Sequence, residues 1–344
     1  MRLLKNREAL LALLILLLIG VVGLRAPIFL SASSMSNLLT DSTLLVMLAL
    51  TQMFVIVTRG IDLSIASNLA LSGMMTALLA SKFPDLSVAV IILVALGIGL
   101  FLGLINGWLI GYLNLPPIVV TLGTMSVYRG LVFVLSGGAW VSSRQMPAAF
   151  IAFPLTHFLG VSHLVWLAAI AIIVMWFIAR YTHFGRDLYA IGNQPVAARY
   201  VGIAISQRLL WTYGLSGMMA GLCGYLWVAR YAVAYTEIAY GFEFTVIAAC
   251  VIGGISIAGG VGSVAGAVLG ALFLSVINNA LPIVKISPFW QSALTGIVIL
   301  TAVVINARGN TKNGRQILSL QSHDPSRQPP PFVQSGQSTV RETV

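Results

Sequence analysis

Few side chains in the apolar parts of this sequence could bind a polar molecule or take part in chemistry. Ionisable groups inside apolar segments are costly and are therefore candidates for function. Asp62 opens one apolar segment, and Arg129 lies about halfway along another. Amide side chains, which both donate and accept hydrogen bonds, stand in apolar segments at four positions: Asn68, Asn106, Asn278 and Asn279. These six residues are candidates to line a path for a polar solute.

Each of these candidates also has a purely structural explanation. Asp62 can cap the helix that follows it, because a carboxylate accepts hydrogen bonds from free N–H groups and suits the positive end of the helix dipole. Arg129 can form an internal salt link or extend toward the membrane edge. The asparagines can make hydrogen bonds between helices. The residue types alone leave the structural and the solute-binding interpretations open.

The sequence lacks the patterns of an enzyme. It contains no G-x-x-x-x-G-K-[ST] segment, so we expect no ATP site in this chain. Its four histidines have no zinc-ligand spacing, and no Ser/His/Asp set is evident. We therefore predict no catalytic residue, no cofactor and no metal.

The elements that position the candidate residues must be membrane helices. Of 344 residues, 58% are hydrophobic and only 8% are charged, and the mean hydropathy is +0.97. A soluble domain carries about 25% charged residues, and a helix spans the hydrocarbon with roughly 20 apolar residues. We predict an all-α polytopic membrane protein, a bundle of about ten transmembrane helices within residues 1–308. The predicted spans are 9–24, 43–58, 62–81, 87–112, 118–136, 163–180, 208–229, 243–258, 262–281 and 289–306.

The distribution of Lys and Arg predicts the orientation in the membrane. The net charge is +10, and the positive residues gather at the N-terminus, in the loop 181–207 and after residue 307. Cytoplasmic flanks are rich in Lys and Arg, so we expect both termini and this loop in the cytoplasm and no role for nucleic acid. Residues 309–344 are rich in Ser, Gln, Pro and Arg, which predicts a disordered cytoplasmic tail.

Glycines at intervals of four mark two of the predicted helices. They are Gly99, Gly103, Gly107 and Gly111 in one, and Gly262, Gly266 and Gly270 in the other. This spacing places bare backbone along one helix face and lets a neighbouring helix approach closely. We predict a compact bundle, in which the glycines serve packing alone or allow function as well.

The segment 182–203 is long for a connection inside a helix bundle. From Pro195 to Val201 it reads as a short helix, because proline suits a first helical turn and Gly202 can end the helix. A surface helix that carries Arg199 and Tyr200 is suited to dock on another protein. The alternative is a charged linker that only fixes topology.

Segment 182–203 resembles the cytoplasmic loop of permease subunits of bacterial ABC importers for monosaccharides, the group with the ribose, xylose and autoinducer-2 permeases. Further segments resemble motifs of the same group, in the same order. They are Gly60-Ile61-Asp62-Leu63-Ser64, Gly103-Leu104-Ile105-Asn106-Gly107, the block from Pro116 to Gly130, and the block from Ile247 to Ser263. One departure is Glu243-Phe244-Thr245, where the family often has Glu-Leu-Asp.

The resemblance implies a complex in the bacterial inner membrane that works by alternating access. Its expected partners are two cytoplasmic ABC ATPase subunits, a periplasmic sugar-binding protein, surrounding lipid and a second permease subunit, either a copy or a relative. The expected ATPase-coupling residues are Gly185, Arg186, Tyr189, Pro195, Ala197, Ala198, Arg199 and Tyr200. An ion-coupled secondary transporter is the alternative, although such carriers need acidic groups near the middle of the membrane.

Overall fold

The computed structural model describes residues 7–283, 290, 293 and 296–297. Its helices are α1 (Arg7–Arg25), η2 (Pro27–Leu30), α2 (Ala32–Val57), α3 (Ile65–Lys82), α4 (Val88–Gly111), α5 (Pro117–Ser136), η3 (Ser143–Gln145), α6 (Ala148–Leu155), α7 (His163–Tyr181), α8 (His183–Asn193), α9 (Pro195–Tyr200), α10 (Ile205–Tyr231), α11 (Phe242–Ile252) and α12 (Val264–Ile283). The predicted span 289–306 and the predicted tail 309–344 fall outside the continuously described part.

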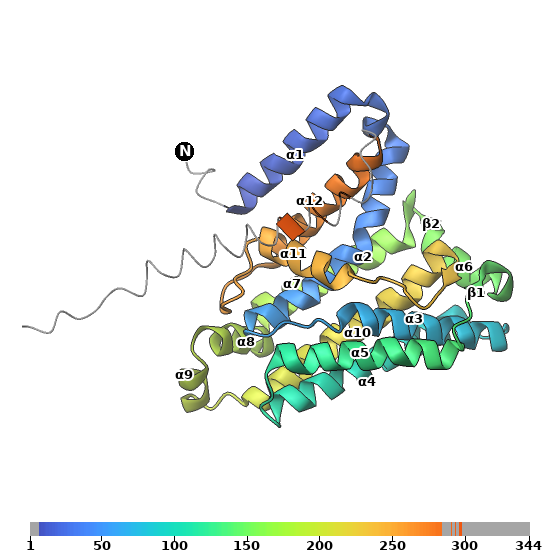
Figure 1. The fold of residues 1–344 in the computed structure, drawn as a ribbon. Helices are drawn as coiled ribbons and strands as arrows, with labels where there is room; N and C mark the ends of the chain where they lie inside the picture. Colours follow the sequence, from blue (N-terminus) through green and yellow to red (C-terminus); the bar gives the residue numbers. More distant parts are fainter. Residues whose placement is uncertain (1–6, 284–289, 291–292, 294–295, 298–344) are drawn as a thin grey trace, which may run out of the picture. The chain divides into compact units, whose positions relative to one another are not determined.

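Four two-residue strands form antiparallel pairs that close connections between helices. Strand β1 (Val141–Ser142) pairs with β4 (Val233–Ala234), and β2 (His157–Phe158) pairs with β3 (Val161–Ser162). Figure 1 shows α6, β1 and β2 at one end of the helical bundle and α8 and α9 at the other. The connections at the two ends therefore have different secondary structure.

Local signals in the sequence explain where several helices begin and end. Ser31 caps α2 by accepting a hydrogen bond from the Ser34 backbone N–H at 3.3 Å, and Thr182 caps α8 in the same way. Proline occupies the first turn of α5 and of α9, where its missing N–H leaves no bond unmade. Gly202, at φ +85°, follows α9 as the sequence predicted.

The described helices agree with the sequence prediction at most of the expected spans. Six of them, α1, α2, α4, α5, α7 and α12, are long and apolar enough to cross a membrane. The span predicted at 243–258 is wrong, because α11 ends at Ile252 and Gly254 follows in a left-handed conformation. The second span begins eleven residues earlier than predicted, at Ala32, and Gly262 precedes α12 instead of lying within it.

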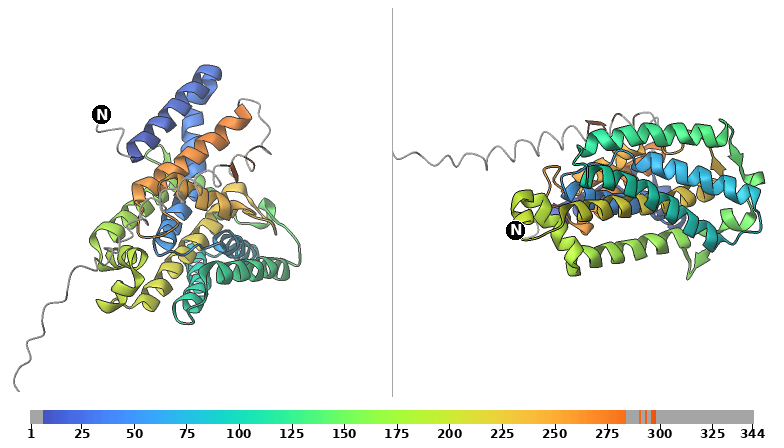
Figure 2. Two further views of the ribbon diagram at one scale, coloured as in Figure 1. Left: turned by 60° about the vertical axis from the view of Figure 1, so that its left-hand side comes forward. Right: turned by 90° about the horizontal axis from the view of Figure 1, so that it is seen from below.

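Helix α2 is the most buried of the six helices that are long and apolar enough to cross a membrane. Every residue from Ser42 to Val57 is buried, because α7, α10, α11 and α12 pack around it. The same cluster of apolar side chains continues into α3 and α10. Figure 2 shows α3, α4 and α10 running alongside one another in the view from below. Among these three helices, α2 packs mainly against α10.

The glycine face of α4 lies against α10, which confirms the predicted close packing. A Cβ atom added at Gly107 would lie 2.6 Å from the Leu210 carbonyl oxygen, and one at Gly111 would lie 2.6 Å from that of Ser206. Gly217 and Gly221 of α10 meet α4 in the same way. We call this contact the α4–α10 seam; it brings two backbones together with no side chain between them.

Candidate functional site

Two of the six path candidates, Asp62 and Asn106, lie in one buried polar network. Asp62 accepts hydrogen bonds from the backbone N–H and the hydroxyl of Ser64, at 2.9 and 2.6 Å, and from the Ser216 hydroxyl at 3.1 Å. Asn106 of α4 donates to the Ser64 hydroxyl at 2.8 Å. We call these four residues the Asp62 network. It joins the connection between α2 and α3 to both α4 and α10.

Asn68 extends the polar contacts along α3. Its amide nitrogen donates to the Gly99 carbonyl oxygen at 3.2 Å, and its oxygen accepts from Ser72 at 3.1 Å. Asp62, Asn68 and Asn106 are each at most 2% exposed. In this conformation their hydrogen bonds hold α3 against α4 and α10.

Arg129 of α5 makes a separate contact. Its guanidinium donates to the carbonyl oxygens of Ile238 and Ala239, at 2.5 and 3.1 Å. The same group lies 5.5 Å from the ring centre of Tyr240. Arg129 thus ties α5 to the segment that precedes α11, and this contact agrees with the structural interpretation of the residue.

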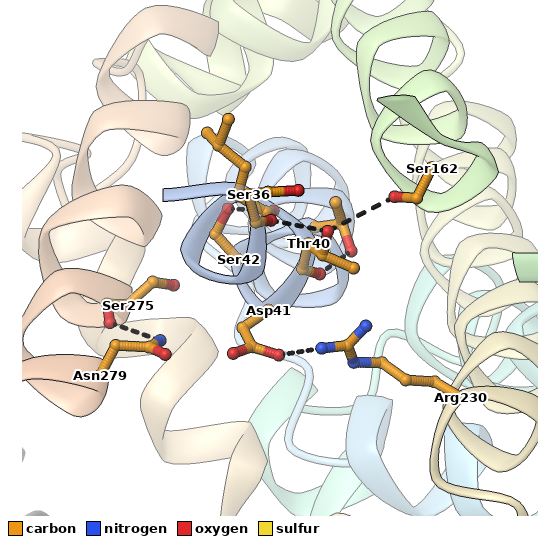
Figure 3. A network of polar contacts seen from close by, with 10 residues as sticks. Ser36, Thr40, Asp41, Ser42, Ser162, Arg230, Ser275 and Asn279 are labelled. Carbon is orange, nitrogen blue, oxygen red and sulfur yellow. Dashed lines mark hydrogen bonds and ion pairs between the residues drawn. The ribbon is translucent and has the colours of Figure 1, made fainter. Parts of the chain in front are cut away.

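A second polar group, which we call the Asp41 cluster, lies between α2, α10 and α12. It comprises Asp41, Arg230, Ser275 and Asn279, drawn in Figure 3. Asp41 forms an ion pair with Arg230, and the Asn279 amide donates to the Ser275 carbonyl oxygen at 3.0 Å. Figure 3 shows Asp41 between Arg230 on one side and Asn279 on the other. Asn278, also half-buried, precedes Asn279 on α12.

Sequence reasoning missed Asp41 and Arg230. Both stand just outside the spans predicted at 43–58 and 208–229, whereas the structure places them inside α2 and α10. The available signal was one charged residue at the end of each of two apolar segments, negative in Asp41 and positive in Arg230. Nothing local to either segment indicates that the two charges pair across 189 positions of sequence.

The segment 182–203 forms two helices, of which α8 is fastened to the bundle. The hydroxyl of Tyr189 donates to the Gly262 carbonyl oxygen at 2.9 Å, and burial raises the pKa of that hydroxyl, which keeps it protonated. Asp187 pairs with Arg208 of α10 at 2.7 Å. A Cβ at Gly185 would lie 2.8 Å from Ala179 Cα. Arg186 contacts Tyr181 and His183 at the surface.

Helix α9 presents most of its predicted docking residues to the exterior. Tyr200 is 87% exposed and Val196 is 65% exposed, and Ala197 and Arg199 are exposed as well. Pro195 begins the helix and is half-buried. Ala198 differs, because it is only 3% exposed and so faces its own chain. A larger side chain at Ala198 would therefore disturb α9 itself.

Comparison with known proteins gives the family. The family described as "Branched-chain amino acid transport system / permease component" matches residues 34–303. The galactose/methyl galactoside import permease protein MglC of Escherichia coli strain K12 is 34% identical over 308 residues, which cover 85% of this chain and 92% of that protein. The autoinducer 2 import system permease protein LsrC of Shigella flexneri is 33% identical over 334 residues, which cover 97% and 96%.

No solved structure matches this chain. The family match and both relatives nevertheless extend over most of its length, and six described helices are long and apolar enough to cross a membrane. This chain is a multi-pass membrane protein and belongs to that family of transport-system permease components.

Proposed function

We propose that this chain is the membrane-spanning subunit of an ATP-driven ABC importer. Its cargo is a monosaccharide or a similar small polar, sugar-like solute, which crosses the bacterial inner membrane by alternating access. The names of the relatives, import permeases for galactosides and for autoinducer 2, support this cargo class. The sequence has no P-loop, and in this proposal ATPase partners supply the energy.

The single observation that carries this proposal is the exposed face of α9. Tyr200, Arg199 and Val196 project from a short helix whose neighbour α8 is fastened to the bundle. An exposed aromatic ring beside an arginine is typical of a binding hot spot. In the proposed arrangement, with ten spans and both termini in the cytoplasm, α9 seats in a groove of a cytoplasmic ATPase subunit. A second permease subunit and a periplasmic sugar-binding protein complete the complex.

The main experiment is uptake by proteoliposomes that contain the permease, its ATPase and its binding protein. We expect uptake only with ATP on the ATPase side and binding protein on the other side. An ATPase variant without its P-loop lysine is the matched control. Uptake that proceeds without ATP and follows an imposed proton or sodium gradient would instead establish the ion-coupled alternative.

Docking has its own test. Tyr200→Ala and Arg199→Ala should each lower retention of the ATPase in detergent pull-downs, because truncating a residue of a binding hot spot typically costs about 2 kcal/mol or more. Arg180→Ala is the matched control, since Arg180 is an exposed arginine at the end of α7 whose side chain forms no hydrogen bond, ion pair or ring contact within the described part. Full retention in both α9 variants would leave α9 as a linker only.

A further inference from the structure

Arg59 follows the end of α2 in a conformation that arginine seldom adopts. Its φ is +68°, in the left-handed region that is uncommon for residues other than glycine. The backbone N–H groups of Arg59 and Gly60 bond back to α2, at 2.9 and 3.0 Å. Such strain persists only where the surroundings determine the conformation. The contacts of the Arg59 side chain hold its backbone in this conformation.

The Arg59 side chain reaches the last residues of α8. Its Nε donates to the Gly192 carbonyl oxygen at 2.7 Å, and Nη2 donates to that of Asn193 at 2.9 Å. The carbonyl groups at a helix C-terminus have no partner within the helix, and a positive charge there is favourable. A single side chain, two residues beyond the end of α2, therefore completes the end of α8, immediately before α9.

A glycine turn closes the same junction. The Gly260 backbone N–H donates to the Val57 carbonyl oxygen at 2.9 Å. A Cβ at Gly192 would lie 2.5 Å from the Gly260 nitrogen, and a Cβ at Gly260 would lie 2.6 Å from the Asn193 amide oxygen. The end of α2, the end of α8 and the turn before α12 thus meet backbone to backbone. Because backbone atoms are in contact here, rearranging side chains alone cannot accommodate a shift of α8.

The junction continues into the Asp62 network. Asp62 lies three residues after Arg59, and through Ser64 and Ser216 it reaches α3 and α10. We propose that Arg59 is the positioning residue that transmits movement of the α8–α9 segment to α2 and to the Asp62 network. This inference rests on the proposed function, because the movement it transmits is that of the ATPase partner.

The test compares Arg59→Ala with Arg180→Ala in the reconstituted importer. Both variants remove one exposed arginine at the α8–α9 end of the bundle, but only Arg59 bonds to α8. We expect Arg59→Ala to retain the ATPase and hydrolyse ATP, while solute carried per ATP falls about fivefold or more, the usual lower range for coupling between sites. Arg59→Lys keeps the charge but lacks the planar guanidinium with its several N–H donors. It should therefore also carry less solute per ATP than the wild type. Equal transport per ATP in Arg59→Ala and Arg180→Ala would overturn the proposal.

A second measurement does not depend on transport. In the purified permease, Arg59→Ala should raise backbone hydrogen exchange both at 189–194 and at 60–68, whereas Arg180→Ala should leave both segments unchanged. Unchanged exchange at either segment in Arg59→Ala would disprove the link, whatever the uptake assay gives. Absence of ATP-driven uptake in the wild-type complex would instead refute the proposed function, and the exchange result would still decide the role of Arg59.

Discussion

Helix α10 takes part in two contacts of opposite kinds. Along the α4–α10 seam, glycines bring two backbones together, so a Cβ at Gly107 would lie 2.6 Å from a carbonyl oxygen. At the Asp41 cluster, α10 meets α2 through the Arg230–Asp41 ion pair, beside amide and hydroxyl groups of α12. The glycine contact depends on close approach of two backbones, whereas polar side chains can exchange partners.

This difference indicates which parts of the bundle move together. The seam and the Asp62 network join α3, α4 and α10 through buried contacts. Packed elements tend to move as rigid bodies that shift at bistable interfaces. We expect α3, α4 and α10 to move as one unit, and α2 and α12 to change their contact with that unit at the Asp41 cluster.

The largest expected effect comes from filling the seam. Gly107→Leu should destabilise the bundle by about 1–3 kcal/mol, because a side chain would have to fit where a backbone now lies. The measurement is the thermal unfolding midpoint in detergent. Gly97→Leu is the matched control on the same helix, since a Cβ at Gly97 has no neighbour within 4 Å. Equal midpoints for the two variants would contradict a tight seam.

Removing one bond of the Asp62 network should have the next largest effect. The pentapeptide Leu-Ser-Gly-Met-Met occurs at 71–75 and 215–219, and its two serines are both fully buried. Ser216 donates to the Asp62 carboxylate, whereas Ser72 donates to the Asn68 amide oxygen. Hydrogen bonds to charged groups contribute more than neutral ones, so Ser216→Ala should lose about 1.5 kcal/mol and Ser72→Ala about 1. A larger loss for Ser72→Ala in chemical unfolding would contradict this ranking.

Breaking the ion pair should have a smaller effect on stability. Asp41 and Arg230 are 31% and 15% exposed, so Asp41→Ala should destabilise by about 1 kcal/mol, between the values for surface and buried pairs. The double variant Asp41→Ala/Arg230→Ala should be more stable than the sum of the single losses predicts, because neither charge is then left unpaired. Strict additivity in this double-mutant cycle would show that the pair contributes nothing in solution.

Sequence reasoning predicted the seam but not the Asp41 cluster, for physical reasons. Glycines four residues apart are a local signal on one helix, and they imply a close partner whatever that partner is. The start of α2 was hidden by the serines and threonines between Ser31 and Thr43, which lower local hydropathy. Asp62 and Asn106 were identified as polar candidates, but their common partner Ser64 becomes evident only when α3 and α4 are placed side by side. Helix α8 mixes polar and apolar residues and gave no clear span signal.

The smallest expected effect on stability is at Asn279, and it tests what the Asp41 cluster does. Among the residues that the structure describes, the Asn279 amide bonds only to Ser275 on its own helix, so Asn279→Ala should change the free energy of unfolding by no more than about 0.5 kcal/mol. If the Asp41 cluster lines the solute path, the same variant should raise the solute concentration needed for half-maximal uptake while ATP hydrolysis continues. Asn68→Ala is the contrasting control, because Asn68 is buried and bonds across to α4. This variant should mainly lower the free energy of unfolding. Normal uptake in Asn279→Ala, together with an unchanged unfolding midpoint, would place the path elsewhere in the bundle and leave the Asp41 cluster as a contact between helices only.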